Sequence, residues 1–179
     1  MNTGQMMITI GAMMLLSFLI LRVNSTQVIS QDAIVDSKLG IVALTIANTY
    51  VDFAKRQVYD SSILDTTISI VELADLKAPN NLGPEGGEVY PFFNDLDDFN
   101  LWDPALGRNI VVRDTTTLAN STDARLFTPF FITSKIYYVS ESDLNAKVNI
   151  RTWYKRLDVF VWTGGSRDTI KYSSISTMW

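Results

Sequence analysis

The sequence lacks both cysteine and histidine. No disulfide can therefore hold a domain together, and neither a thiolate nor an imidazole is available as nucleophile, general base or transition-metal ligand. Since histidine is the commonest general base in enzymes, we expect a protein that is not an enzyme. A basic excess is also missing, because the formal net charge is −4. Nucleic-acid-binding domains usually carry a basic face, so we expect no nucleic-acid partner.

Proline and charge are both absent from the start of the chain. The first proline is Pro79, and no Asp, Glu, Lys or Arg precedes Arg22. Residues 5–21 form a nearly continuous apolar run, close to the lower limit of about 17 residues for a helix that crosses a bilayer. A secretory signal peptide would need a basic start and a small-residue cleavage site, and a buried core helix is the other alternative. We predict a membrane or filament-core helix whose apolar side chains are Met6, Met7, Ile8, Ile10, Met13, Met14, Leu15, Leu16, Phe18, Leu19, Ile20 and Leu21.

Helical periodicity continues far beyond this run. Apolar residues recur at steps of three, four or seven, which predicts an amphipathic helix over residues 28–59. Lys55 and Arg56 suit the C-terminal end of such a helix, where cations meet the negative end of its dipole. Gly40 lies mid-helix and would allow either a bend or close helix packing. The predicted apolar stripe consists of Val28, Val35, Leu39, Val42, Ile46, Tyr50 and Phe53.

The middle of the chain, residues 60–128, reads as loops with short strands. Residues 66–71 alternate as a first strand would, and residues 79–87 are rich in Pro, Asn and Gly. The densest acidic stretch follows, and its carboxylates are candidate calcium ligands: Asp95, Asp97, Asp98 and Asp103. The alternative is a solvated acidic turn with Phe99 and Trp102 in the core. No other metal or cofactor is expected.

Two Asn-X-Ser/Thr sequons occur, at Asn24 and Asn120. Both are candidate glycosylation sites, but the pattern is short and arises often by chance. Neither site needs to carry a glycan.

The last fifty residues predict an antiparallel meander. Strands are expected at residues 130–139, 154–162 and 169–176, with residues 148–152 leading into the second and a hairpin connection at residues 163–166. Within the second strand, Leu157, Val159 and Val161 share one face, opposite Asp158 and the aromatic residues. A sheet with one apolar face and a helix with one apolar stripe can cover each other. We therefore predict an α+β fold, in which a long N-terminal α-helix packs against a C-terminal antiparallel β-meander headgroup.

This order of elements resembles the type IV pilin superfamily of pilins and secretion pseudopilins. The tail Tyr154-Lys155-Arg156-Leu157 through Val161-Trp162-Thr163-Gly164-Gly165 to Ser174-Ile175-Ser176-Thr177 is similar to the last two strands of minor pilins and pseudopilins. The segment Asp95-Leu96-Asp97-Asp98-Phe99-Asn100 is similar to a turn in the same group. The resemblance implies a hydrophobic transmembrane or filament-core segment at residues 1–27 and a headgroup at residues 28–179.

The same resemblance implies function and location. The chain would be the structural subunit of an extracellular filament and would polymerise with copies of itself. Before assembly it would lie in the inner or cytoplasmic membrane, served by a pilus assembly or secretion machinery. The alternatives are a minor pilin or secretion pseudopilin, or a single-pass, membrane-anchored cell-surface binding module.

The first residues depart from the pilin pattern. Pilins are usually cut after a glycine, and the mature helix carries a glutamate at its fifth position. Cleavage between Gly4 and Gln5 would place Thr9 there, and a mature chain that starts at Met1 would place Gln5 there. No cleavage is the third alternative. Each alternative lacks the carboxylate that would pair with a neighbouring subunit's amino terminus.

Overall fold

A computed structural model describes residues 2–64, 72–103, 108–114, 129–164 and 168–178. It begins with one helix, α1 (Thr3–Lys55). The chain divides into two compact units, Met1–Lys38 and Leu39–Trp179. From Thr3 onward the first unit is helix, and the second unit, the headgroup, contains the last turns of α1 together with every strand that the structure describes.

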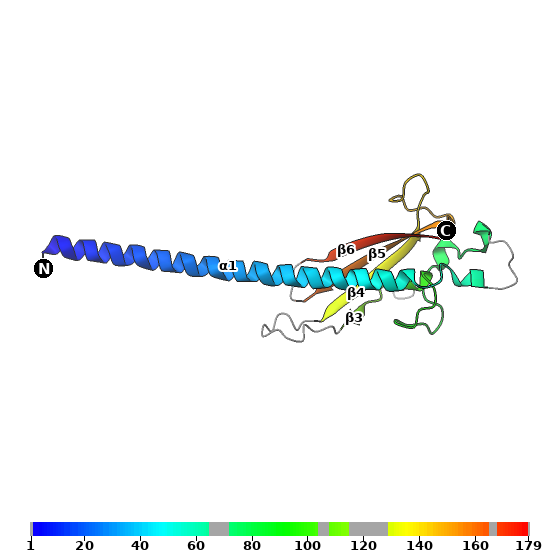
Figure 1. The fold of residues 1–179 in the computed structure, drawn as a ribbon, viewed down its shortest axis with the longest axis horizontal. Helices are drawn as coiled ribbons and strands as arrows, with labels where there is room; N and C mark the ends of the chain where they lie inside the picture. The colour runs from blue at the N-terminus through cyan, green and yellow to red at the C-terminus, as the bar shows by residue number, and fades with distance from the viewer. Residues whose placement is uncertain (1, 65–71, 104–107, 115–128, 165–167, 179) are drawn as a thin grey trace. The chain divides into compact units, whose positions relative to one another are not determined.

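The headgroup is built on a four-stranded antiparallel sheet. Its order is β3 (Val112–Asp114), β4 (Phe130–Tyr138), β5 (Tyr154–Thr163) and β6 (Ile170–Thr177), so each strand lies beside the next one along the chain (Figure 1). In this register Ile136 pairs with Leu157, and Val161 pairs with both Ile132 and Ile170. The three predicted strands are thus confirmed to within about two residues at each end, and the short β3 extends the meander by one strand.

The C-terminal part of α1 packs against this sheet. Tyr50 of the helix lies 3.1 Å from Ser134 of β4, hydroxyl oxygen to hydroxyl oxygen. The buried side chains of this part of the helix include three small ones, Ala43, Ala47 and Ala54. On the sheet side, Leu157, Val159 and Val161 are buried as the alternation predicts. The predicted α+β arrangement of helix and meander is therefore what the structure shows.

Several details of the predicted helix differ. It ends at Lys55 instead of residue 59, and it continues as helix through Gly40, where an added Cβ would meet nothing within 4 Å. Of the predicted stripe, Val28 is 53% exposed because α1 has no partner there in the described chain. The stripe that is buried in the headgroup includes alanines that the sequence reading left out.

Two predicted extended segments are not part of the described sheet. Residues 148–152, expected to lead into the second strand, contain bends and no strand. The nearest pairing is an isolated bridge between Val139 and Lys147, followed by a hydrogen bond from Val148 N–H to the Tyr138 carbonyl at 3.0 Å. Residues 66–71 lie outside the described residues.

Loops and short elements connect α1 to the sheet. Where the structure describes them, they include the 3-10 helices η1 (Ser61–Leu64), η2 (Leu73–Asp75), η3 (Pro79–Asn81) and η4 (Asp97–Phe99). They also include a two-stranded ribbon of β1 (Trp102–Asp103) and β2 (Arg108–Asn109). Phe99 is fully buried and lies edge-on to the rings of Tyr50, Phe53 and Phe93. The predicted core position of Phe99 is confirmed, whereas the Trp102 side chain lies outside the described residues.

Candidate functional site: the apolar helix segment and a buried lysine–aspartate cluster

The apolar run of α1 is entirely exposed. The exposed fractions of its large side chains range from 46% at Ile10 to 78% at Met7. This helix is long and apolar enough to cross a membrane. Such a surface is stable only against lipid or other apolar protein surface, because exposure of each fully apolar side chain to water costs about 1.5–3 kcal/mol.

The two hydroxyls within the run are satisfied by the helix itself. Thr9 Oγ1 donates to the carbonyl oxygen of Met6 at 2.8 Å, and Ser17 Oγ donates to that of Met13 at 2.9 Å. A polar group in hydrocarbon is costly unless its hydrogen bonds are made internally. With no ionisable side chain before Arg22, the run is therefore compatible with membrane anchoring.

The predicted processing residues lie in the first turn of the same helix. Gly4 is exposed, and the Gln5 amide donates to the Asn2 carbonyl at 2.9 Å. Cleavage between them stays a prediction.

The acidic segment is not a solvated turn. Asp95, Asp97 and Asp98 have no exposed surface at all. The chain buries them because Leu96 N–H donates to the Val58 carbonyl at 2.8 Å, which holds this segment against the residues that follow α1. The expectation of a solvated turn was wrong, since alternation of acidic and apolar residues says nothing about what covers them.

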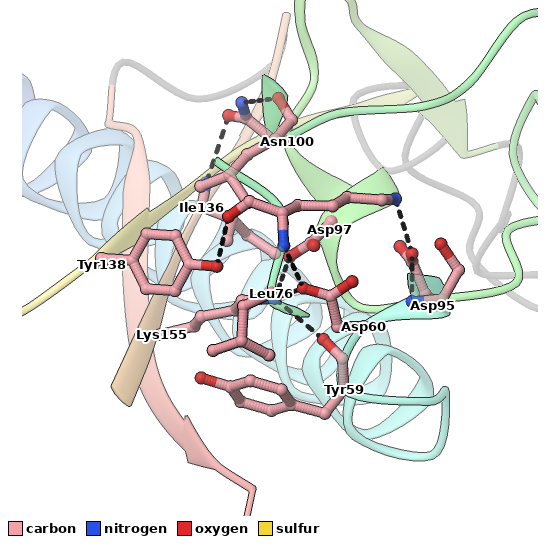
Figure 2. Close-up of polar contacts among 12 residues, drawn as sticks. Tyr59, Asp60, Leu76, Asp95, Asp97, Asn100, Ile136, Tyr138 and Lys155 are labelled. Atoms are coloured by element: carbon pink, nitrogen blue, oxygen red, sulfur yellow. Dashed lines mark hydrogen bonds and ion pairs between the residues drawn. The ribbon is translucent and has the colours of Figure 1, made fainter. Parts of the chain in front are cut away.

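Two lysines from distant parts of the chain enter this acidic segment. Lys155 of β5 is fully buried, and its Nζ lies 2.7 Å from Asp97 Oδ1 and 3.1 Å from Asp60 Oδ2 (Figure 2). It also donates to the Tyr59 carbonyl at 3.0 Å and lies 4.4 Å from the centre of the Tyr59 ring. Figure 2 shows its ammonium group pointing into the space between Asp60 and Asp97.

Lys77 makes the second ion pair. Its Nζ lies 2.7 Å from Asp95 Oδ2 and 3.0 Å from Glu85 Oε1, and the Glu85 side chain is half exposed. The Lys77 amide donates to Asp60 Oδ2 at 2.9 Å, so the two pairs share one polar cluster.

The loop that carries Lys77 is attached to the sheet by side chains. Tyr138 Oη donates to the Lys77 carbonyl at 2.8 Å, and Arg151 Nε donates to the Leu76 carbonyl at 2.7 Å. Asn100 links the next loop, because its amide nitrogen donates to the Leu82 carbonyl and its oxygen accepts from Ile136 N–H (Figure 2). These bonds hold the charged groups of the cluster in place from several directions.

The predicted calcium ligands therefore play different parts. Carboxylate oxygens of Asp60, Asp95 and Asp97 lie within 4.8 Å of one another, close enough for one cation. The two lysine ammonium groups occupy this acidic environment instead. Asp98 accepts from the amides of Asn94 and Asp95 at 2.9 and 3.2 Å, as a turn-capping group does, and the side chain of Asp103 lies outside the described residues. Calcium binding stays a prediction, with lysines 2.7 Å from two of its proposed ligands.

Burial and charge move the carboxyl pKa values in opposite directions. Burial raises the pKa of Asp97 to about 7, although Lys155 opposes the shift. Burial acts on Asp60 as well, but there the Lys155 charge and hydrogen bonds from Ser62 and the Lys77 amide outweigh it and hold the pKa below its usual value. Two neighbouring carboxyl groups thus differ in protonation near neutral pH.

Some of the polar atoms in this cluster have no hydrogen-bond partner. Among the described residues, these buried atoms include Asp97 Oδ2, Asp98 Oδ1 and the Tyr59 hydroxyl. Asp97 is therefore held by its ion pair with Lys155 and lacks the backbone donors that a permanently ionised carboxylate usually gathers.

The structure does not test either predicted glycosylation site. Asn24 is exposed on α1, and the hydroxyls of Ser25 and Thr26 in its sequon both donate to the Arg22 carbonyl at 2.9 Å. Asn120 lies outside the described residues. Modification at either position stays a prediction.

Sequence reasoning missed Asp60, Lys77 and Lys155. For Lys155 a signal was present, because the alternation that turns Leu157, Val159 and Val161 inward also turns residue 155 inward. A lysine on the buried face of a strand calls for an acidic partner. Nothing in the sequence around Asp60 or Lys77 indicates that these two residues belong to the same cluster.

The chain was compared with known proteins. No protein-family model matches it, and neither a curated protein nor a solved structure does.

Proposed function

We propose that this chain is the structural, non-enzymatic subunit of an extracellular filament of the type IV pilin kind. In this proposal α1 first anchors the subunit in the inner or cytoplasmic membrane, with the headgroup outside. The assembly machinery then extracts it, and the apolar runs of successive copies bundle together along the filament axis.

The observation that carries this proposal is the continuity of α1. One helix, Thr3–Lys55, supplies both an uncharged, wholly exposed apolar run and a buried stripe in the headgroup core. A simple anchor needs only about 20 apolar residues and can be joined to its domain by a flexible linker. Here the apolar run and the buried stripe belong to one element, so each copy of the chain carries both a surface for association and part of a folded headgroup, as a repeating subunit requires.

Self-association also has a physical basis in the composition of the run. Helices that leave lipid exchange one apolar environment for another, so packing and the absence of buried charge decide whether they associate. The run has neither an ionisable group nor an unsatisfied hydroxyl, so copies can bury it against each other without a polar penalty. Repetition of one such heterologous contact gives an open helical polymer.

The first test is a charge placed in the run. Leu16→Lys should remove the chain from sheared extracellular fibres, because a lysine at the centre of an apolar helix costs about 2.5–3.5 kcal/mol. That cost, on the order of a hundredfold in an equilibrium constant, falls both on insertion of the run into lipid and on its burial among other subunits, and either effect removes the chain from fibres. Fibre yield is measured by electron microscopy and immunoblotting of the sheared fraction, with the headgroup checked by circular dichroism.

Asn80→Lys is the matched control. It introduces the same side chain at an exposed position of η3 in the headgroup and should leave fibres intact. Normal fibres from Leu16→Lys would contradict a filament-core role for the run. A wild-type chain found only as a monomer in the membrane fraction would favour a single-pass binding module instead.

A further inference from the structure

Lys155, Asp60 and Asp97 form a buried cluster that an anchoring or filament role does not use. All three side chains are fully buried, and Nζ lies in contact with an oxygen of each carboxyl group, at 2.7 Å for Asp97 and 3.1 Å for Asp60. The Asp97 oxygen that this nitrogen contacts is bonded directly to the carboxyl carbon that the amine would attack. No diffusion is needed to bring nucleophile and electrophile together, which is a large part of the barrier to such a reaction.

The surroundings give the two carboxyl groups different roles. Asp60 accepts hydrogen bonds from Ser62 N–H and the Lys77 amide. These bonds stabilise its carboxylate, the form that can accept a proton. Asp97 accepts no such bond from the backbone, and its Oδ2 has no partner among the described residues. The raised pKa of Asp97, about 7 because of burial, agrees with a protonated, electrophilic carboxyl group. Separation of two acids into a base and a neutral acid by their environments is a common arrangement in catalytic sites.

Aromatic rings lie beside the lysine, and all three charged groups are shielded from water. The rings of Tyr59 and Tyr138 lie 4.4 and 5.4 Å from Lys155 Nζ (Figure 2). The side chains of Lys155, Asp60 and Asp97 have no exposed surface. An environment that excludes bulk water favours formation of an amide over its hydrolysis and strengthens the electrostatic contacts.

We propose that Lys155 and Asp97 form an intramolecular amide (isopeptide) bond, with Asp60 as the base. One proton passes from the Lys155 ammonium to the Asp60 carboxylate. The neutral amine then attacks Cγ of protonated Asp97, so that the N–Cγ bond forms and the Cγ–OH bond breaks. The hydroxyl leaves as water with one hydrogen of the amine, and Asp60 ends protonated. The reaction needs no oxidant, cofactor or second protein.

This cross-link would give the headgroup a covalent constraint that a chain without cysteine cannot obtain from a disulfide. It would join β5 to η4 and close the chain between residues 97 and 155 into a ring. Tension applied at the two ends of the headgroup would then bypass that ring, which suits a subunit under load. The proposal goes beyond the filament role and does not depend on it, since the reaction occurs within one chain.

The test is the mass of the wild-type full chain, purified as a monomer in detergent. The trypsin-generated peptides of residues 78–108 and 152–156 should appear as one branched species that lacks one water molecule. Fragmentation should map the link to Asp97 and Lys155. Two separate peptides of full mass, residues 78–108 and, because trypsin cleaves after an unmodified Lys155, residues 152–155, would overturn the proposal. A missing water that maps to a cyclic imide within Asp97 itself would also overturn it.

Variants separate the roles. Lys155→Arg and Asp97→Ala should each give the two peptides at full mass, and Asp60→Asn should slow or abolish linkage while near-UV circular dichroism reports a folded headgroup. Lys77→Arg, which keeps the neighbouring ion pair, should still link and is the control. Linkage that is equally complete in folded Asp60→Asn would remove Asp60 as the base. Because every measurement uses the monomer, a failure here leaves the filament proposal standing, and loss of fibres leaves this one standing.

Discussion

At the scale of single residues, the headgroup contains several charged groups that are buried and multiply bonded. Lys155 and Lys77 reach one acidic environment from distant parts of the sequence. Removal of one partner from such a buried pair typically costs about 3–5 kcal/mol because the other charge is left uncompensated. Asp158 is a second example, on the other face of β5. It accepts from Tyr137 Oη at 3.0 Å and Arg156 Nε at 2.9 Å, and it pairs with Lys171 Nζ at 3.0 Å.

Asp158 should make stability depend on acid pH. Burial would raise the pKa of Asp158, but hydrogen bonds from Ser173, Arg156, Lys171 and Tyr137 outweigh it and lower the pKa to about 2. A carboxyl group with a depressed folded pKa stabilises the protein above its unfolded pKa and loses that contribution as the pH falls through the folded value. Asp158→Asn should therefore cost about 1–2 kcal/mol at neutral pH, after allowance for partly exposed Lys171. The difference should shrink as the pH falls below about 4 and be lost below about pH 2.

Urea unfolding followed by tryptophan fluorescence in detergent micelles measures this difference at each pH. Asp52→Asn, the same change at an exposed helix position, should cost less. A difference between wild type and Asp158→Asn that is the same at all pH values would contradict the assignment.

At the scale of elements, the contact between α1 and the sheet depends on small side chains. Ala47 and Ala54 have no exposed surface, and beside them Tyr50 reaches Ser134, whose hydroxyl in turn donates to the Phe99 carbonyl at 2.6 Å. Small side chains lie on the buried face of the helix next to Tyr50, and this buried tyrosine is satisfied by a hydroxyl of the strand. Burial raises the pKa of Tyr50, and the Ser134 hydrogen bond only partly opposes it, so this phenol stays neutral.

Ala47→Leu should destabilise the headgroup. Three extra carbon atoms at a fully buried position force the helix away from the sheet or strain its rotamer, at a cost of about 1–3 kcal/mol. Ala33→Leu is the control, because residue 33 is exposed on the same helix. Thermal unfolding of both variants in micelles is followed by near-UV circular dichroism. Equal melting temperatures for the two would show that the alanine face is not tightly packed.

At the scale of the whole molecule, the two units differ in what stabilises them. The headgroup has its own core, whereas residues up to Lys38 are helix with almost every described side chain exposed. Among the described residues this apolar helix segment has no tertiary partner, so its side chains leave water only where lipid or another apolar surface covers them.

The absence of native cysteine allows this to be measured with single introduced thiols. Asn80→Cys, in the headgroup, should react with a membrane-impermeant maleimide on intact cells and on isolated fibres. Leu16→Cys should be protected in both and react only after solubilisation in denaturant. Labelling of Leu16→Cys in intact fibres would contradict burial of the apolar run, and protection of Asn80→Cys on intact cells would contradict an outward headgroup.

What the sequence by itself determined is the set of elements that local periodicity controls. The uncharged run before Arg22 and the recurrence of Leu39, Ile46 and Tyr50 define one helix, and the alternation of Leu157, Val159 and Val161 defines a half-buried strand. These patterns are legible because a helix or strand face is set by residues only two to seven positions apart. Covering of one apolar face by the other then follows from the hydrophobic effect.

Only the tertiary structure decided the fate of the charged groups. Asp60 and Lys155 are 95 positions apart, and Lys77 and Asp95 meet through loops whose paths no periodicity describes. Whether an aspartate is solvated, caps a turn as Asp98 does, or faces a buried lysine depends on what the folded chain places over it. The burial and the partners of the charged residues were therefore not predictable from the sequence. The energy of an ionised group is set by its whole surroundings and not by its neighbours along the chain.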